Sequence, residues 1–392
     1  MEIYEIATGY TSVPAKVGAA TEIVVEELTK AFIDNSVNAK IIDMADKNRK
    51  ETDLPIIEVN IPSFLISADT SLGIIHKVKR VVYSVLLAGK LKKIIKNADE
   101  KIVLHFHNQY NLFFFLKLTS KKLRSKCFIA YTNHSGIWSL DLEDITDVLK
   151  RRYFQEAYAL RKADRVFFLN EKMLDNAVKY LSISPERFTT IANGVNTDIF
   201  HPLSDEEIQN AKKNFGFENK NVFLQIGSIY ENKNHKKSLR ILSDYLKAHP
   251  ESIYAYAGGI VSEEYQSQIL RTANELGIES QVKYLGMLKP GEELNALYNS
   301  CCANILVSDY EGFPLVIVES LSAGTPVLLE INSPFSLGDG CVALNKDNFE
   351  ITADYLLNNR ELRSAARKNA EKSYSWNAVA INYIEEIQAN IN

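Results

Sequence analysis

The clearest signals for the start and the end of a helix lie in the stretch Asp309-Tyr-Glu-Gly-Phe-Pro-Leu-Val-Ile-Val-Glu-Ser-Leu-Ser-Ala-Gly-Thr-Pro-Val327. It follows an apolar run, Ala303–Val307, that predicts a buried strand. Pro314 suits the first turn of a helix, and Gly324 suits the residue just after its end. The stretch therefore predicts a strand, a loop and a helix over Leu315–Ala323, with a second strand beyond it.

The same alternation of strand and helix extends in both directions from this stretch, and it predicts an α/β protein with parallel, doubly wound sheets. The expected strands before residue 200 are Glu2–Ala7, Ala39–Asp43, Lys101–His105, Phe128–Thr132, Arg165–Leu169 and Phe188–Ile191. Those after it are Asn221–Ile226, Ser252–Ala257, Val282–Leu285, Ala303–Val307 and Pro326–Glu330.

The chain has 392 residues, more than one hydrophobic core usually holds, so two domains are expected. A polar stretch at Thr197–Asp205 interrupts the alternation and serves as the expected linker. We therefore expect one Rossmann-like domain over 1–198 and another over 199–374, facing each other across a cleft. A last helix within 375–392 is expected to join the first domain.

The overall composition is that of a folded protein rather than a collagen-like or disordered chain, with 46% hydrophobic and 24% charged residues and a net charge of −4. No apolar run reaches the roughly 20 residues that a membrane-spanning helix needs. The first ten residues predict a strand and lack the pattern of a signal peptide. These features favour a cytoplasmic location.

The segment Lys77–Lys126 concentrates positive charge, with thirteen basic residues and only two acidic ones, interleaved with apolar residues. Such a pattern is typical of contact with an anionic membrane surface. A solvated helix face or a groove for another polyanion gives the same pattern. Nucleic acid is not an expected partner, because no nucleic-acid-binding motif accompanies the segment.

The loop and helix of the opening stretch place two carboxylates, Glu311 and Glu319, beside a helix start. The first amides of a helix have no acceptor within it, so those of Phe313, Leu315 and Val316 can bind an anion such as a diphosphate. Carboxylates next to a diphosphate suit hydrogen bonding to the vicinal hydroxyls of a sugar and a ribose. The sequence therefore predicts a site for a nucleoside diphosphate sugar.

At this point the sequence resembles the retaining nucleotide-sugar glycosyltransferases of glycosyltransferase family 4, which have the GT-B fold. Glu311 and Glu319, set in Glu-Gly-Phe-Pro and followed by Ala-Gly-Thr-Pro-Val, look like the family signature. Ile191–Phe200, Gln225–Asn234 and Tyr284–Gly286 resemble three further family segments in the same order.

The resemblance implies roles for individual residues. Glu311 and the backbone of Gly312–Leu315 would hold the donor sugar and diphosphate, and Glu319 would bind the ribose. The catalytic set that it implies is Glu311, His134 and Lys233. The implied donor-binding set is Gly18, Ala19, Gly227, Ser228, Lys233, Glu311, Gly312, Phe313, Pro314, Leu315, Val316 and Glu319.

The family also implies the reaction: a hexosyltransferase that retains configuration by front-side attack and needs no metal ion or other cofactor. The absence of a strand-terminal Asp-x-Asp agrees with a metal-independent reaction. The expected acceptor is a glycan or lipid-linked molecule in surface polysaccharide biosynthesis. An enzyme of this kind would be cytoplasmic, and the basic segment makes the inner face of the membrane a candidate location.

Ser228 departs from the family pattern, which usually has arginine at this position. Without the arginine a bidentate phosphate ligand is missing, and the nearby Asn232, Asn234, His235 and Lys236 could partly replace it. One alternative is therefore a catalytically silent GT-B subunit that partners another glycosyltransferase. An NAD(P)-dependent oxidoreductase is disfavoured because Gly-x-Gly-x-x-Gly is missing after the first strand. A glycosidase using Glu311 and Glu319 is disfavoured because hydrolysis needs no adjacent anion site.

Overall fold

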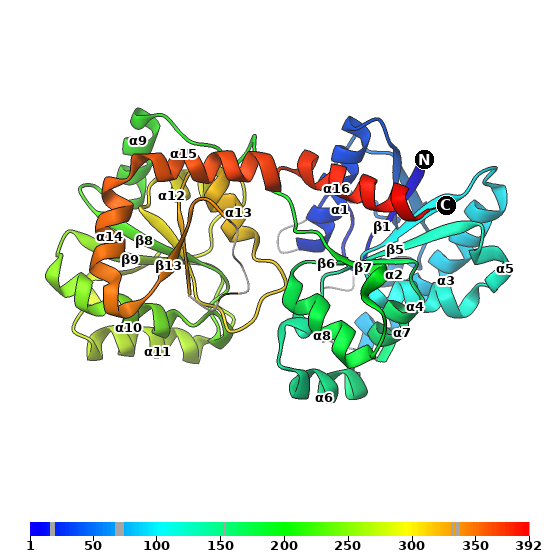
Figure 1. Cartoon of the computed structure of the whole chain (residues 1–392), viewed down its shortest axis with the longest axis horizontal. Helices are drawn as coiled ribbons and strands as arrows, with labels where there is room; N and C mark the ends of the chain where they lie inside the picture. Colours follow the sequence, from blue (N-terminus) through cyan, green and yellow to red (C-terminus); the bar gives the residue numbers. More distant parts are fainter. Residues whose placement is uncertain (16–19, 67–73, 153, 331–332, 334–337, 392) are drawn as a thin grey trace. The chain divides into compact units, whose positions relative to one another are not determined.

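The computed structural model describes residues 1–15, 20–66, 74–152, 154–330, 333 and 338–391. The chain divides into two compact units (Figure 1). The first comprises Met1–Gly194 together with Trp376–Asn392, and the second comprises Val195–Ser375. Each unit is built around its own parallel sheet.

The sheet of the first unit has seven strands in the order β3-β2-β1-β4-β5-β6-β7, and every pairing is parallel. The order reverses between β1 and β4, and ligands of such sheets bind beyond the carboxyl ends of the strands at this point. The strands are β1 (Glu2–Ile6), β2 (Asn38–Met44), β3 (Ile56–Val59), β4 (Ile102–Phe106), β5 (Cys127–Asn133), β6 (Arg165–Phe168) and β7 (Phe188–Thr190).

The last helix of the chain completes the first unit. Helix α16 (Trp376–Asn390) packs against α1 (Ala20–Asp34), and Phe32 and Tyr383 share one hydrophobic core with Trp376. A Cβ atom on Gly194 would lie 2.5 Å from the Trp376 ring, so glycine is required there. The other helices are α2 (Ser63–Ile66), α3 (Ile74–Asn97), α4 (Gln109–Leu118), α5 (Lys121–Arg124), α6 (Leu142–Arg152), α7 (Phe154–Lys162) and α8 (Glu171–Leu181).

The sheet of the second unit has six parallel strands in the order β10-β9-β8-β11-β12-β13. Val222 and Leu224 of β8 belong to one hydrophobic core, whereas Phe223 belongs to another, so both faces of the sheet are covered. The strands are β8 (Asn221–Ile226), β9 (Ser252–Ala257), β10 (Val282–Tyr284), β11 (Ala303–Leu306), β12 (Val327–Glu330) and β13 (Cys341–Leu344).

The first helix of the second unit begins at the end of the predicted linker, in a stretch for which the sequence predicted no element. Ser204 and Glu207 form a capping box, because the Ser204 side chain accepts from the Glu207 amide and the Glu207 carboxylate accepts from the Ser204 amide. The helices are α9 (Asp205–Phe215), α10 (His235–Ala248), α11 (Glu263–Glu275), α12 (Glu292–Asn299), α13 (Leu315–Ser322), α14 (Phe349–Asn358) and α15 (Arg360–Asn369).

The expectation of two Rossmann-like, doubly wound sheets is confirmed by these two topologies. Within the described residues, none of the helices combines the length and the apolar character that a membrane crossing requires.

Candidate active site

Helix α13 begins directly after Pro314, which occupies the position before the first helical residue rather than the first turn itself. Leu315 and Val316 open the helix and are partly buried, and the Val316 carbonyl accepts from the Asn304 side chain at 3.0 Å. Gly312 and Phe313 precede the helix, and the Phe313 ring lies 6.4 Å from that of Tyr374. The helix start therefore lies at the carboxyl end of β11, with its first amides directed away from the helix body.

Lys233 and Glu311 form an ion pair beside this helix start. The Lys233 Nζ atom donates to the Glu311 carboxylate, and the two side chains are only 17% and 15% exposed. Lys233 follows β8 and Glu311 follows β11, and these strands are neighbours in the sheet. Two residues 78 positions apart in the chain therefore meet at one edge of the sheet.

The loop that carries Lys233 is anchored to the protein interior by the side-chain amide of Gln225. The Gln225 Nε2 atom donates to the Lys233 carbonyl at 2.6 Å, and Gln225 Oε1 accepts from Ser238 and from Tyr254. Gln225 is 2% exposed, so these bonds are shielded from water. The backbone position of Lys233 is thus fixed by the core of the second unit.

Two asparagines join the Lys233 loop to the Glu311 loop. Asn232 donates to the Tyr310 carbonyl at 3.1 Å and accepts from the Tyr310 amide at 3.2 Å. Asn234 donates to the Asp309 carboxylate. The sequence suggested Asn232 and Asn234 as substitutes for a missing phosphate ligand, whereas both side chains have contacts within the protein.

Glu319 lies one turn further along α13 and points to Tyr298 of α12. Its Oε2 atom accepts from the Tyr298 hydroxyl at 2.9 Å. Burial raises the pKa of Glu319 to about 7, and the Tyr298 hydrogen bond offsets part of that effect. Near neutral pH this carboxyl is therefore poised between its protonated and ionised forms.

Gly227 lies at the end of β8, where the stem of Lys233 crosses it, and a Cβ atom there would lie 3.2 Å from Lys233 Cε. A Cβ atom on the neighbouring Gly258 would lie 2.0 Å from the Gly227 carbonyl oxygen, so only glycine fits at 258. Ser228 follows on the exposed side of the loop. The space that an arginine would need at position 228 therefore opens to solvent.

In the first unit, His134 follows β5 and is partly exposed. Its Nε2 atom lies 2.9 Å from Nδ1 of His107, which follows β4. Burial lowers the pKa of His134 well below its usual value, and the neighbouring His107 and His105 lower it further. His134 is therefore neutral at physiological pH.

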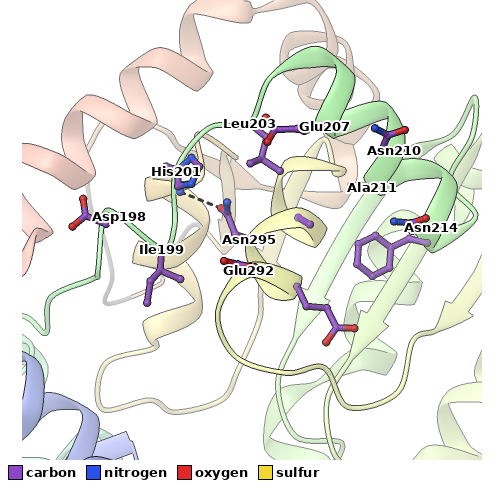
Figure 2. A pocket seen from close by; sticks show the side chains of 13 residues that line it. Asp198, Ile199, His201, Leu203, Glu207, Asn210, Ala211, Asn214, Glu292 and Asn295 are labelled. Carbon is purple, nitrogen blue, oxygen red and sulfur yellow. Dashed lines mark hydrogen bonds between the residues drawn. The ribbon is translucent and has the colours of Figure 1, made fainter. Parts of the chain in front are cut away.

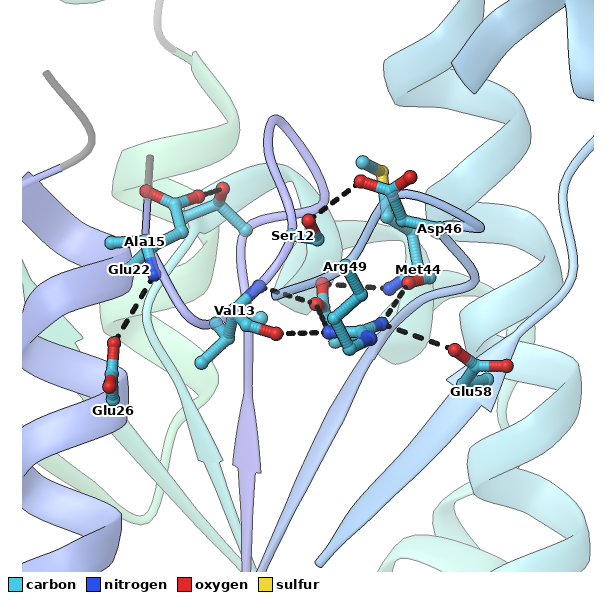
Figure 3. A network of polar contacts seen from close by, with 12 residues as sticks. Ser12, Val13, Ala15, Glu22, Glu26, Met44, Asp46, Arg49 and Glu58 are labelled. Atoms are coloured by element: carbon cyan, nitrogen blue, oxygen red, sulfur yellow. Dashed lines mark hydrogen bonds and ion pairs between the residues drawn. The ribbon is translucent and has the colours of Figure 1, made fainter. Parts of the chain in front are cut away.

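The loop after β1 is fixed by a polar network that involves the next strand (Figure 3). Asp43 accepts from the Val13 amide at 2.8 Å and from Arg49 at 2.8 Å, and Arg49 also donates to the Met44 carbonyl at 2.6 Å. Ser12 donates to Asp46 at 2.8 Å. Gly18 and Ala19, which the resemblance places near the phosphates, lie outside the described residues.

Two family models match this chain. A model of the Glycosyltransferase Family 4 proteins matches residues 21–199, and one of the glycosyl transferases group 1 matches residues 206–373. Together the two models cover most of the chain. The chain belongs to the family 4 glycosyltransferases.

Relatives of this glycosyltransferase include a GDP-mannose:cellobiosyl-diphosphopolyprenol alpha-mannosyltransferase of Xanthomonas oryzae pv. oryzae, 25% identical over 94% of this chain and 93% of the relative. A mannosylfructose-phosphate synthase of Agrobacterium fabrum is 27% identical over 56% of this chain. That match spans about half (52%) of the synthase.

A solved structure with the same fold is the catalytic domain of starch synthase IV from Arabidopsis thaliana, bound to ADP and acarbose. It is 15% identical, with a TM-score of 0.71 over 100% of this chain and 99% of that one. The fold of this glycosyltransferase is therefore GT-B.

The second unit contains a hollow of about 720 Å³ (Figure 2). It opens between α9 and α12, where Asn295 accepts from the His201 amide at 3.1 Å. Glu207, Glu292 and Glu293 also line it, so its acidic wall is unsuited to a diphosphate. None of the predicted donor-binding residues that the structure describes lines this hollow.

Replacing Ser228 by arginine is expected to strengthen binding of a nucleoside diphosphate by about 3–10-fold, because a guanidinium would form charge-assisted hydrogen bonds to phosphate. Calorimetric titration of both proteins with UDP, GDP and ADP measures the change. Ser228→Gln, which adds length without charge, is the control and should bind like the wild type. Equal affinities for all three proteins would contradict a phosphate position beside residue 228.

Proposed function

We propose that this glycosyltransferase moves a sugar from a nucleoside diphosphate sugar to a glycan or lipid-linked acceptor. The observation that carries the proposal is the Lys233–Glu311 pair at the start of α13, with Glu319 one turn further along the helix. A diphosphate flanked by two sugars needs positive charge and hydrogen-bond donors at its phosphates, and acceptors at the sugar hydroxyls. The lysine and the helix amides supply the former, and the two carboxylates supply the latter. The glycosyltransferases named above support this assignment by their family relationship.

Each residue then has a chemical task in the proposed reaction. The bond between sugar and phosphate breaks with negative charge developing on the departing diphosphate. Lys233 and the first amides of α13 would stabilise that charge, and electrostatic stabilisation of this kind usually contributes most to the rate enhancement of an enzyme. Glu311 would bind sugar hydroxyls, and Glu319 would bind the ribose. Retention of configuration by front-side attack, without a metal ion, is part of this proposal.

The silent-subunit alternative depends on Ser228 alone. Lys233, Glu311 and Glu319 are all present and brought together at the edge of one sheet, so an active enzyme is the better-supported function. Hydrolysis of a donor sugar in the absence of an acceptor would exclude the alternative. Failure to bind any nucleoside diphosphate would favour it.

We also propose that the acceptor is lipid-linked, within surface polysaccharide synthesis. The Xanthomonas relative acts, by its name, on a diphosphopolyprenol. In the present chain, α3 carries an exposed apolar stripe, Ile75, Val78, Val81 and Val85, at spacings of three and four residues. A stripe of this kind flanked by lysines fits the interface of an anionic membrane.

The six lysines of α3 differ in exposure, and Lys90 and Lys92 are partly exposed. Lys77, Lys93 and Lys96 are exposed, whereas Lys79 is buried and its Nζ donates to the Tyr10 carbonyl at 2.9 Å. The Arg80 guanidinium lies 3.8 Å from the centre of the Tyr110 ring. The exposed three are therefore the residues through which α3 would meet lipid headgroups.

Replacing Lys77, Lys93 and Lys96 together by serine is expected to weaken binding to vesicles containing anionic lipid. At about 1 kcal/mol per lysine the loss is roughly a hundredfold in partition coefficient. Co-sedimentation with phosphatidylglycerol vesicles measures it. The control variant replaces Lys213, Lys368 and Lys372, three exposed lysines of the second unit, and should bind like the wild type. Equal losses in both variants would indicate a general effect of protein charge and contradict the proposal that α3 contacts the membrane.

A further inference from the structure

A chain of hydrogen bonds runs through the core of the first unit and ends at His134. Glu5 of β1 and His105 of β4 are register partners on neighbouring strands. The Glu5 Oε2 atom lies 2.6 Å from Nε2 of His107, and Nδ1 of His107 lies 2.9 Å from Nε2 of His134. Glu5 is fully buried and His107 is 3% exposed, whereas His134 is partly exposed. The chain therefore leads from a buried carboxylate to the predicted catalytic histidine.

A second branch leaves the other oxygen of Glu5 and does not reach His134. The Glu5 Oε1 atom lies 2.8 Å from Nδ1 of His105, and Nε2 of His105 lies 2.7 Å from the Thr132 hydroxyl. Thr132 is in turn 3.0 Å from the Tyr383 hydroxyl. Both oxygens of the carboxylate and both nitrogens of each of the two buried imidazoles are therefore engaged.

The positions of the protons follow from the ionisation of Glu5. Burial alone would raise the pKa of Glu5, but its hydrogen bonds and electrostatic attraction to the His105 and His107 rings lower it to about 2. An ionised carboxylate can only accept, so Nε2 of His107 carries a proton. Burial, together with His105, lowers the pKa of His107, so its Nδ1 atom is an unprotonated acceptor. His134 must then donate from Nε2, and as a neutral ring it keeps Nδ1 unprotonated.

The same three residues could in principle hold a metal ion, since the donor atoms of Glu5, His105 and His107 lie within 4.8 Å of one another. Each of these nitrogens is, however, at hydrogen-bond distance from a carboxylate oxygen, a hydroxyl or another imidazole. A metal ion would have to replace the protons that make these contacts. The distances favour a hydrogen-bonded chain.

We propose that Glu5 is a positioning residue that acts through His107 to hold His134 in the Nε2–H tautomer, leaving Nδ1 to accept a hydrogen bond from a hydroxyl of the donor sugar. The inference rests on the proposed function for the sugar and on the geometry above for the tautomer. A neutral acceptor nitrogen favours a sugar hydroxyl, which can donate a hydrogen bond, over a carboxylate or another group that can only accept. The tautomer of His134 would therefore contribute to the choice of donor sugar. Because the tautomer is fixed, the Nδ1–H form of His134, which could not accept this hydrogen bond, is not populated when the donor binds.

The test measures the tautomer and the reaction separately. Long-range proton–nitrogen spectra of histidine-labelled wild type, with His134→Gln for assignment, are expected to show His134 as the neutral Nε2–H form. His107→Phe removes the acceptor, and Glu5→Gln removes the charge that orients His107. Both variants should give a mixture of tautomers at His134 and lose about 10–100-fold in kcat, the size of loss found when metal-bound histidines lose their orienting partner. Tyr383→Phe, at the end of the other branch, is the control and should keep the wild-type tautomer.

Several outcomes would overturn the proposal. They are an imidazolium or an Nδ1–H form at His134 in the wild type, an unchanged tautomer in His107→Phe, and a stoichiometric metal ion bound at Glu5, His105 and His107. The wild-type spectrum reports the tautomer of His134 even if Glu5→Gln fails to fold. A wild-type protein that shows the expected tautomer but turns over no donor would contradict the proposed function and leave the positioning chain intact.

Discussion

Replacing Lys233 by methionine is expected to lower kcat for donor turnover by about 100–1,000-fold, the cost of removing one preorganised group that stabilises developing negative charge. The effect should fall on kcat more than on KM, because charge on the diphosphate grows as the bond to the sugar breaks. Steady-state kinetics of donor hydrolysis or transfer measures it. Lys233→Arg, which keeps the charge but not the shape, should retain part of the rate.

The Lys233 variant also leaves Glu311 without its cation in a site that is largely shielded from water. A drop in thermal stability is therefore expected alongside the drop in rate. The double variant Lys233→Met, Glu311→Gln should regain stability without regaining turnover, which separates the two effects. Lys237→Met is the matched control, since Lys237 of α10 is 48% exposed and pairs with Glu330 of β12. A wild-type rate in Lys233→Met would contradict the assigned role.

Replacing Glu319 by glutamine is expected to weaken nucleoside diphosphate binding by about 10–100-fold, because a charged acceptor for the ribose hydroxyls is lost. Glutamine keeps the shape of the side chain and still accepts from the Tyr298 hydroxyl, so the helix should be undisturbed. Titration calorimetry with UDP, GDP and ADP measures the affinity. Unchanged affinity for the nucleotide that binds the wild type would remove Glu319 from the ribose role.

The same variant should be more stable than the wild type at alkaline pH. The pKa of Glu319 is raised from 4.5 to about 7, so the folded protein binds a proton that the unfolded chain has released. Stability is therefore lost as pH rises from 4.5 through 7, by up to about 3 kcal/mol above pH 7. Glu319→Gln removes this penalty, so the two proteins should differ at about pH 8 and agree near pH 4.5.

Chemical unfolding at both pH values measures this difference. Burial likewise raises the pKa of Glu156 in the first unit to about 7, so Glu156 also lowers the stability of the wild type as the pH rises. The comparison between variant and wild type cancels that contribution. Glu275→Gln, at an exposed position on α11, is the control and should give no difference at either pH. A destabilised Glu319→Gln at alkaline pH would contradict the assigned ionisation.

Much of the fold was predictable because parallel strands buried on both faces leave continuous apolar runs in the sequence. The run Ala303–Val307 and the proline and glycine around α13 predicted one strand, one loop and one helix correctly. Helix α9 was missed because its residues are mostly polar and its start is marked only by the Ser204 capping box.

The candidate site was predictable only where a motif is local. Glu311 and Glu319 lie on one loop and one helix, so their relation to the start of α13 follows from spacing. The pairing of Glu311 with Lys233 joins residues 78 positions apart, and the chain from Glu5 to His134 joins three strand ends. The His105-x-His107 pattern at a strand end, facing the acidic residue of an adjacent strand, was the available signal. On its own that pattern favours a structural role, and the role of the chain in orienting His134 stays a prediction.

A crystal structure of the protein with the nucleoside diphosphate that binds it tests the central claim most directly. We predict that the terminal phosphate contacts the first amides of α13 and Lys233 Nζ, and that the ribose hydroxyls contact Glu319. A diphosphate bound elsewhere, with the Lys233–Glu311 pair unchanged and the start of α13 unoccupied, would contradict the proposed donor site.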